Sequence, residues 1–297
     1  MEAIKPILYY SIFNYPLNED EIYRFAKTSD LARLQEELKE LIDKKIIIKH
    51  HGFYVYNNDT KSAKQRLKGN KNAKEVMPKA LKRAAFISKF PYIKSVQISG
   101  SLSKGYYDND GDVDFFLITK PNRLWIARTC LIAYKKIVLQ NSKKYFCVNY
   151  FISSNQLEIP EKNLFTATEL ATLIPVTGKA QYTDFKQANN WANNYFPNIG
   201  TSKNQEIIDV KPFKISKFLE FIFNSKLGDI TDNLFRKLTL KRWMSKFNDL
   251  DKQQFEIALK STKSVSKHHP QNFQKKVIDA YNTKIKEFEN TYNLKIN

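Results

Sequence analysis

Residues 98–118 read ISGSLSKGYYDNDGDVDFFLI and contain the features that decide the fold. Gly100 and Ser101 directly follow one apolar run, and Asp112 and Asp114 open a second. Short apolar runs that are bounded by turn residues are typical of buried strands. Because residues two apart in a strand face the same side, the two aspartates are expected to project together. We therefore expect two neighbouring strands with a glycine turn after the first.

The residue types in this stretch favour a site for a divalent cation and a phosphate group. Two adjacent carboxylates repel each other and are tolerated when they share a cation, and Mg²⁺ prefers such hard oxygen ligands. Gly100 has no side chain, so a backbone amide and the Ser101 hydroxyl can approach phosphate oxygens closely. The alternative is a solvated surface turn at residues 108–112, DNDGD. That alternative leaves the apolar runs on either side unexplained.

The order of these residues resembles the signature of the DNA polymerase beta-like nucleotidyltransferase superfamily. In that signature a strand ends in Gly-Ser, a short segment follows, and the next strand carries Asp-x-Asp. Here ISGS at 98–101 is followed after ten residues by DVDF at 112–115, and the resemblance covers residues 92–155. The whole chain also resembles an uncharacterised bacterial group in which a winged helix precedes such a domain.

The resemblance implies an enzyme that transfers a nucleoside monophosphate from an NTP, such as ATP, to an acceptor hydroxyl with release of pyrophosphate. Asp112 and Asp114 would be the catalytic carboxylates and would hold Mg²⁺ or Mn²⁺, which stabilises charge on the attacking and leaving oxygens. The residues that would bind the phosphates of the NTP are Gly100, Ser101, Ser103 and Lys104. The acceptor could be a small molecule, a protein or a nucleic-acid end.

One position departs from the family pattern. Members of the family usually supply a third carboxylate from the next strand of the core, and here that strand, KYFCVNYFIS at 144–153, carries Asn149. An amide oxygen can bind Mg²⁺, but it has no charge and cannot act as a base. Glu158 or Glu169 could substitute from the following segment. The expected metal ligands are Asp112, Asp114 and Asn149.

Asn149 also supports a second hypothesis about function. The fold would bind a nucleotide with weakened or lost catalysis, and the N-terminal winged helix would report that state to DNA or to a partner protein. A carboxylate from Glu158 or Glu169 on the face of the two aspartates would favour the enzyme. Asn149 alone on that face would favour the nucleotide-binding sensor.

The chain is strongly basic, with 49 Lys and Arg against 30 Asp and Glu and a net charge of +19. Such an excess favours polyanionic partners, either nucleic acid or the triphosphate of a nucleotide, although a solvated lysine-rich surface would give the same composition. The two cysteines lie in apolar stretches, which indicates a reducing compartment. No signal peptide and no apolar run long enough to span a membrane is visible, so we expect a cytoplasmic protein without a membrane partner. His268 and His269 are adjacent and point apart, so no zinc site is expected.

Residues 1–60 have three segments of helical apolar spacing followed by two short β-rich runs, 45–49 and 53–56. This order is typical of a winged helix-turn-helix, although the third segment, LARLQEELKELIDKK, is more acidic than most helices that read DNA. Residues 61–94 are basic and contain a single acid, Glu75. They predict a helical connector that either binds nucleic acid or is a solvated lysine-rich helix.

The expected fold class is α/β (α+β), with a small mixed-sheet nucleotidyltransferase core between a winged helix and a helical C-terminal region. The expected strands are 95–99, 113–118 and 145–153, with a helix at 124–139. The expected later helices are 166–173, 183–195, 216–247, broken near Gly228, and 273–292. The expected domains are a winged helix-turn-helix at 1–60, a basic helical connector at 61–91, a nucleotidyltransferase core at 92–158 and a helical C-terminal domain at 159–297.

Overall fold

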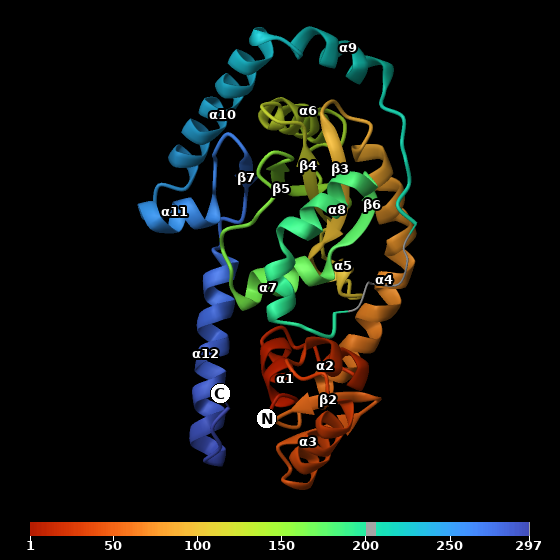
Figure 1. Ribbon diagram of the computed structural model, residues 1–297, viewed down its shortest axis with the longest axis vertical. Coiled ribbons are helices and arrows are strands. Elements are labelled where there is room, and N and C mark those ends of the chain that lie inside the picture. The colour runs from red at the N-terminus through yellow and green to blue at the C-terminus, as the bar shows by residue number, and fades with distance from the viewer. Residues whose placement is uncertain (200–205, 297) are drawn as a thin grey trace.

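A computed structural model describes residues 1–199 and 206–296 (Figure 1). The described chain is a mixed α/β structure in which helices surround a small mixed sheet. Figure 1 shows the N-terminal unit at one end of the long axis, the sheet in the middle, and helices α9 (Lys214–Phe223) and α10 (Lys226–Lys246) at the other end. The expected combination of helices with a small mixed sheet is therefore confirmed.

The N-terminal unit consists of three helices followed by a two-stranded antiparallel hairpin, in the order that the sequence predicts. The side chain of Asn18 accepts a hydrogen bond from the Glu21 amide, and the Glu21 carboxylate accepts one from the Asn18 amide. This capping box begins the second helix. The backbone amide of Tyr54 donates to the Leu17 carbonyl, which ties the hairpin to the helices. The elements are α1 (Ile4–Ser11), α2 (Glu19–Phe25), α3 (Leu31–Asp43), β1 (Ile47–His50) and β2 (Phe53–Tyr56).

Helix α4 (Thr60–Ile87) joins the N-terminal unit to the sheet and has two different faces. Small residues on its inner side, such as Ala63 and Ala84, are fully buried, whereas its lysines are exposed. Arg66 is the exception among the basic residues, because its guanidinium is buried against the N-terminal unit. The expected helical connector, residues 61–91, is one helix that ends at Ile87.

The central sheet has five strands in the order β6-β3-β4-β5-β7. Its strands are β3 (Ile93–Ser99), β4 (Asp114–Thr119), β5 (Cys147–Ser153), β6 (Ile174–Thr177) and β7 (Val265–Lys267). Strands β4 and β5 are parallel and are joined by helix α6 (Leu124–Ile137), and each other neighbouring pair in this sheet is antiparallel. The sequence predicts the three central strands. It does not predict β6 and β7, which are short and lie in the segment that was expected to be helical.

Helices cover both faces of this sheet. Helices α4 and α6 pack on one face, where Phe115 of β4 is buried. Helix α8 (Lys179–Ala188) and the end of α7 (Leu164–Thr172) lie over the other face, where Phe116 is buried. A strand that is buried on both faces carries apolar residues at consecutive positions. This explains why the run that follows Asp114 does not alternate between apolar and polar residues.

The later helices follow the predicted pattern with two corrections. The expected helix 183–195 is two elements, α8 and the 3₁₀ helix η1 (Asn190–Asn194). The expected break near Gly228 lies instead at residues 224–225, between α9 and α10. Gly228 is inside α10, where a Cβ atom would lie 1.8 Å from the Phe223 carbonyl oxygen, so the glycine permits close packing of the two helices.

Helix α12 (Phe273–Tyr292) agrees with its expected bounds, and a short helix, α11 (Lys252–Ala258), precedes it. Helix α12 runs from the region of the sheet along the N-terminal unit, where it packs against α1 (Figure 1). No helix in residues 1–199 or 206–296 is both long enough and apolar enough to cross a membrane.

Candidate functional site

Gly100 lies directly against the carboxylate of Asp114. Strand β3 ends at Ser99, Gly100 begins the short helix α5 (Gly100–Ser103), and Ser99 pairs with Asp114 at the start of β4. The φ angle of Gly100 is +68°, which L side chains rarely adopt. A Cβ atom at this position would lie 2.4 Å from Asp114 Oδ2. Both the backbone conformation and the contact therefore require glycine.

The carboxyl group of Asp114 is largely buried, and its pKa is raised. The pKa of Asp114 is raised from its ordinary 3.8 to about 6, mainly by burial and also by the negative charges of Asp112 and Glu169. A hydrogen bond from the Cys147 thiol acts in the opposite direction. The side-chain amide of Asn149 also donates to Asp114, with Nδ2 3.0 Å from Oδ1. A cation beside this carboxylate would therefore stabilise its charged form.

Asn149 reaches Asp114 because β5 contains a β-bulge. Consecutive residues of β4 pair with Val148 and Tyr150, so Asn149 is the additional residue between them. A bulge re-aims a side chain without ending the strand. The Nδ2 atom of Asn149 lies 3.0 Å from the Cys147 sulfur as well as near Asp114. The predicted neighbourhood of Asp114 and Asn149 is thus present, with the amide nitrogen rather than the oxygen facing the carboxylate.

Two of the predicted phosphate-binding residues, Ser103 and Lys104, contact the carbonyl oxygen of Gly100. The Ser103 hydroxyl donates to this oxygen at 2.8 Å, and the Lys104 ammonium donates to it at 3.1 Å. Lys104 also forms an ion pair with Glu169 of α7, at 2.8 Å. Ser101 is exposed, and its hydroxyl has no hydrogen bond within the described residues. Ser101 is therefore available to a ligand, whereas Ser103 and Lys104 are already engaged with the protein.

Asp112 and Glu158 lie outside the strands of the sheet. Asp112 precedes the first residue of β4 and acts on Asp114 through its charge. Glu158 is exposed and pairs with Lys162 at 2.7 Å. In the part of the chain that the structure describes, no three side chains from His, Cys, Asp and Glu form a group that could hold a metal ion. Mg²⁺ is often held by one or two carboxylates together with substrate phosphates and water, so oxygen ligands from Asp112 and Asp114 fit a cation that arrives with a nucleotide.

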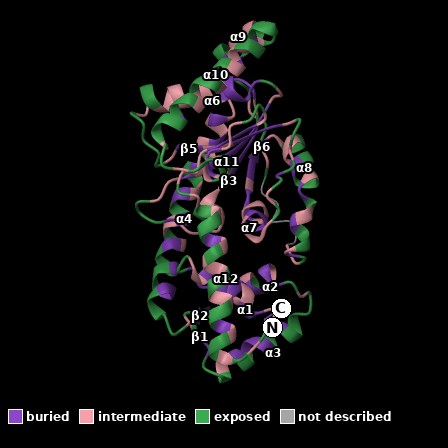
Figure 2. Cartoon of the chain, turned by 90° about the vertical axis from the view of Figure 1, so that its left-hand side faces the viewer, coloured by how far each residue is buried: buried purple, intermediate pink, exposed green. Residues whose placement is uncertain are grey.

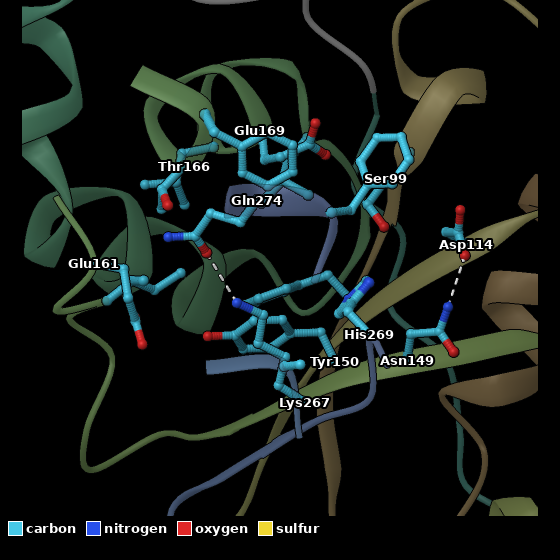
Figure 3. A pocket seen from close by; sticks show the side chains of 18 of the residues that line it. Ser99, Asp114, Asn149, Tyr150, Glu161, Thr166, Glu169, Lys267, His269 and Gln274 are labelled. Atoms are coloured by element: carbon cyan, nitrogen blue, oxygen red, sulfur yellow. Dashed lines mark hydrogen bonds between the residues drawn. The ribbon is translucent and has the colours of Figure 1, made fainter. Parts of the chain in front are cut away.

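A cavity begins at Asp114 and extends between the sheet, α7 and the segment around β7 (Figure 3). Its volume is about 130 Å³, and the cavity that adjoins it has a volume of about 410 Å³, which is the size of an ordinary small-molecule site. We call the former the Asp114 cavity, and its polar lining includes Asp114, Asn149, Tyr150, Glu161, Lys267 and His269. Figure 3 shows Asp114 and Asn149 at one end and Glu161, Lys267 and Gln274 at the other. A second cavity, lined by Tyr15, Ser101 and Lys104, adjoins it at Gly100 and Asp114.

The far end of the Asp114 cavity contains unsatisfied hydrogen-bonding groups. Lys267 is only 8% exposed, and its ammonium donates to Gln274 at 3.0 Å. Burial lowers the pKa of Lys267. One carboxylate oxygen of Glu161 and the side-chain oxygen of Asn272 are buried without a partner among the described residues. Buried polar atoms normally have partners, so this end of the cavity suits a ligand with both donors and acceptors.

His269 lines both cavities and is neutral at pH 7. The pKa of His269 is lowered from its ordinary 6.5 to about 4, mainly by burial and also by the positive charge of Lys267. A neutral imidazole can donate one hydrogen bond and accept another. His268 lies on the other side of the chain against Trp243, so the two adjacent histidines do point apart, as expected.

The pKa of Asp114 leads to a prediction about stability. Below pH 3.8 the carboxyl group is protonated in both folded and unfolded chains, and as the pH rises towards 6 only the unfolded chain loses the proton. The free energy of unfolding therefore falls over this range, by roughly 3 kcal/mol in total. Asp114→Asn removes the free-energy cost of the buried negative charge. It should therefore stabilise the metal-free protein above pH 6 by up to about 3 kcal/mol.

Urea denaturation of both proteins at several pH values measures this effect. The matched control is Asp110→Asn in the exposed loop, which makes the same substitution without removing a buried charge. A variant at Asp114 that is equally stabilised at pH 4 and pH 8 would contradict the explanation, because the penalty must vanish at low pH.

The sequence could not place the groups that line the rest of the Asp114 cavity. Lys267 and His269 belong to a short edge strand and the loop after it, far along the chain from Asp114 and without a local motif. Glu169 was predicted only as one of two substitutes, and its pairing with Lys104 depends on how α7 packs. Comparisons of the chain with protein-family models, with curated proteins and with solved structures find no match.

Proposed function

We propose that the chain is a nucleotidyltransferase that moves a nucleoside monophosphate from an NTP to an acceptor hydroxyl with Mg²⁺ and releases pyrophosphate. The observation that carries the proposal is the contact of Gly100, with its positive φ, against Asp114 on the adjacent strand. This contact leaves room for a phosphate beside the carboxylate only because no side chain intervenes. In this proposal residues 1–60 are a winged helix and residues 92–158 are the nucleotidyltransferase core.

The proposed roles follow from the surroundings of each group. Asp112 and Asp114 would hold the cation, and Asn149 would turn its amide so that the oxygen faces it. The Ser101 hydroxyl would bind a phosphate oxygen, and Lys104 would exchange its contact with Glu169 for the phosphates. Mg²⁺, when bound, would stabilise charge on the attacking and leaving oxygens.

The Asp114 cavity supports a nucleoside rather than inorganic phosphate as the ligand. Its walls are mostly apolar and aromatic, and they include Phe116, Tyr150 and Phe165. Apolar and aromatic walls with a few polar groups are typical of small-molecule sites. In this arrangement the phosphates would lie at Gly100 and the base would extend towards Lys267.

Exposed lysines on α4 support a nucleic-acid end as the acceptor. They recur at intervals of three to five residues along the outer side of the helix, at Lys61, Lys64, Lys68, Lys71, Lys74, Lys79 and Lys82. A row of this kind can follow the phosphates of a nucleic acid. Helix α3, in contrast, exposes Glu36 and Glu40, which disfavours it as a helix that reads DNA bases.

Incubation of the protein with each α-labelled NTP, Mg²⁺ or Mn²⁺, and either cell extract or short DNA and RNA tests the enzyme directly. We expect label to move from one NTP to an acceptor, and we expect Asp112→Ala/Asp114→Ala to reduce transfer by at least about a hundredfold. Transfer that survives in the double variant would exclude this site. No transfer together with no NTP binding would exclude nucleotide function altogether.

A second candidate function, a nucleotide sensor without efficient catalysis, is favoured by Asn149. This amide occupies the place of the usual third carboxylate, and the nearby Glu169 forms an ion pair with Lys104. A route for coupling also exists, because Tyr15 of the N-terminal unit donates its hydroxyl to the carbonyl oxygen of Lys104. Tyr15 in turn packs against Arg66 of α4. A ligand that moves Lys104 would therefore act on the N-terminal unit.

Asn149→Asp separates the two candidates. A third carboxylate should strengthen cation binding, and in a sensor that has lost catalysis it should raise transfer by about tenfold or more. In an enzyme already adapted to the amide, the added negative charge beside Asp114 should leave transfer unchanged or lower it. Asn149→Ser is the control that removes the amide without adding charge.

A further inference from the structure

Helices α9 and α10 expose a continuous series of large apolar side chains. They form an arch over α6 at the end of the molecule opposite the N-terminal unit (Figure 1). Figure 2 shows that the strands of the sheet are mostly buried (purple), whereas much of α9 is exposed (green). Phe221 is 84% exposed and Ile230 is 67% exposed. Single exposed apolar residues are normal on a protein surface, whereas a contiguous group of them marks an interaction site. The exposed apolar residues of this face are Ile215, Phe218, Phe221, Leu227, Ile230, Leu234, Leu238 and Met244.

The acids of these two helices have partners in the rest of the protein, although the Asp229 side chain is 57% exposed. Residues 214–246 contain three acids, and each has an internal partner. Glu220 accepts a hydrogen bond from the Tyr92 amide at 2.6 Å, and Asp232 accepts one from the Ile126 amide at 2.9 Å. Asp229 pairs with Arg123. Each acid of the two helices therefore has a partner within the protein.

The exposed charge on the same helices is positive. The exposed basic residues are Lys214, Lys217, Lys226, Lys237, Lys241, Arg242 and Lys246. On α10, Lys237 and Lys241 lie between the exposed leucines in the helical repeat rather than on a separate face. Long lysine side chains can place their stems beside apolar groups and their ammonium groups in a polar layer. The face is thus both apolar and cationic.

We propose that the outer face of α9 and α10 binds the surface of a membrane that contains anionic lipids, with the two helices lying in the plane of the interface. Helices of this kind insert their apolar side chains among the acyl chains and place their lysines at the anionic headgroups. The contacts of the arch with α6 and Tyr92 lie on its inner side. Such a convex face suits a deformable lipid surface.

Other occupants fit these observations less well. A nucleic acid would use the lysines but would leave Phe218, Phe221 and Ile230 in water. A second copy of the chain would bring two cationic faces together, which is unfavourable. The absence of a membrane partner was expected from the lack of a long apolar run, but a helix that lies on a membrane needs only one apolar side.

Co-sedimentation of the full chain with vesicles tests the proposal. One set contains phosphatidylcholine alone, and the other contains phosphatidylcholine with phosphatidylserine. We expect binding to the second set at physiological salt and little binding to the first. Phe218→Ser/Phe221→Ser and Lys237→Glu/Lys241→Glu should each reduce the partition coefficient by about tenfold or more.

Matched variants elsewhere serve as controls. Leu31→Ser/Leu67→Ser removes side chains that are 44% and 45% exposed on the N-terminal unit and α4. Lys64→Glu/Lys68→Glu applies the same charge change to α4, and circular dichroism checks that each variant folds. Both control pairs should leave the partition coefficient within about twofold of the original.

Three results would overturn the proposal. The original chain could fail to bind phosphatidylserine vesicles, or the α4 lysine pair could reduce binding as much as the α10 pair. The third result is a folded chain that ignores vesicles but binds a synthetic acidic amphipathic peptide through Phe218 and Phe221. That result would assign the face to a protein partner.

Discussion

Replacement of Gly100 by alanine should slow nucleotidyl transfer by about a hundredfold, since small misplacements of reacting groups have effects of this size. The added methyl group would lie 2.4 Å from Asp114 Oδ2, so the carboxylate would have to move away from the proposed cation position. The positive φ of +68° adds backbone strain of roughly 1–2 kcal/mol. We therefore expect a loss of both Mg²⁺–NTP affinity and stability, measured by calorimetry and by urea denaturation.

Gly105 provides a matched control for this prediction. Its φ is +75°, and a Cβ atom there would meet nothing within 4 Å. Gly105→Ala should thus show the strain without the contact, with a similar loss of stability and nearly unchanged NTP affinity. Equal effects of the two substitutions on NTP affinity would mean that the contact between Gly100 and Asp114 has no special role.

Replacement of Arg66 by alanine should lower the free energy of unfolding by about 3–5 kcal/mol, which is typical when one partner of a buried ion pair is removed. The Arg66 guanidinium pairs with Glu21, donates to the Pro16 carbonyl at 3.0 Å and to Asn70 at 2.8 Å. It also lies 3.5 Å from the centre of the Tyr15 ring. Without Arg66, the Glu21 carboxylate loses its cation and Tyr15 loses its packing.

Two further variants show whether this explanation holds. Lys68→Ala, on the exposed side of the same helix, should change the free energy of unfolding by less than about 0.5 kcal/mol. Arg66→Ala/Glu21→Gln should be more stable than Arg66→Ala, because the second substitution removes the unpaired charge. A loss below about 1 kcal/mol for Arg66→Ala would show that the group is hydrated rather than buried.

The sequence predicts the centre of the sheet well because the evidence there is local. The apolar runs around residues 95–99 and 113–118 have the length of strands and end in turn residues. The proximity of Gly100 to Asp114 follows from their positions at the end of one strand and the start of its neighbour. These relations need only strand periodicity and a short connection.

The rest of the site depends on packing between distant segments. The β-bulge at Asn149 turns its side chain towards Asp114, and no feature of residues 144–153 marks that bulge. The engagement of Lys104 with Glu169 requires α7 to lie over the turn at Gly100. Lys267 and His269 reach the cavity because β7 pairs with β5, across more than a hundred residues of sequence.

The most direct test of a nucleotide and cation site at Gly100 and Asp114 is a titration of Mn²⁺ with a non-hydrolysable NTP, followed by electron paramagnetic resonance. We expect the chain to bind Mn²⁺ together with the nucleotide, Asp114→Ala to lose this binding, and Asn149→Asp to bind more tightly through its added carboxylate. Gly105→Ala should behave like the original chain. Equal binding by Asp114→Ala, or no binding by the original chain, would contradict the assignment.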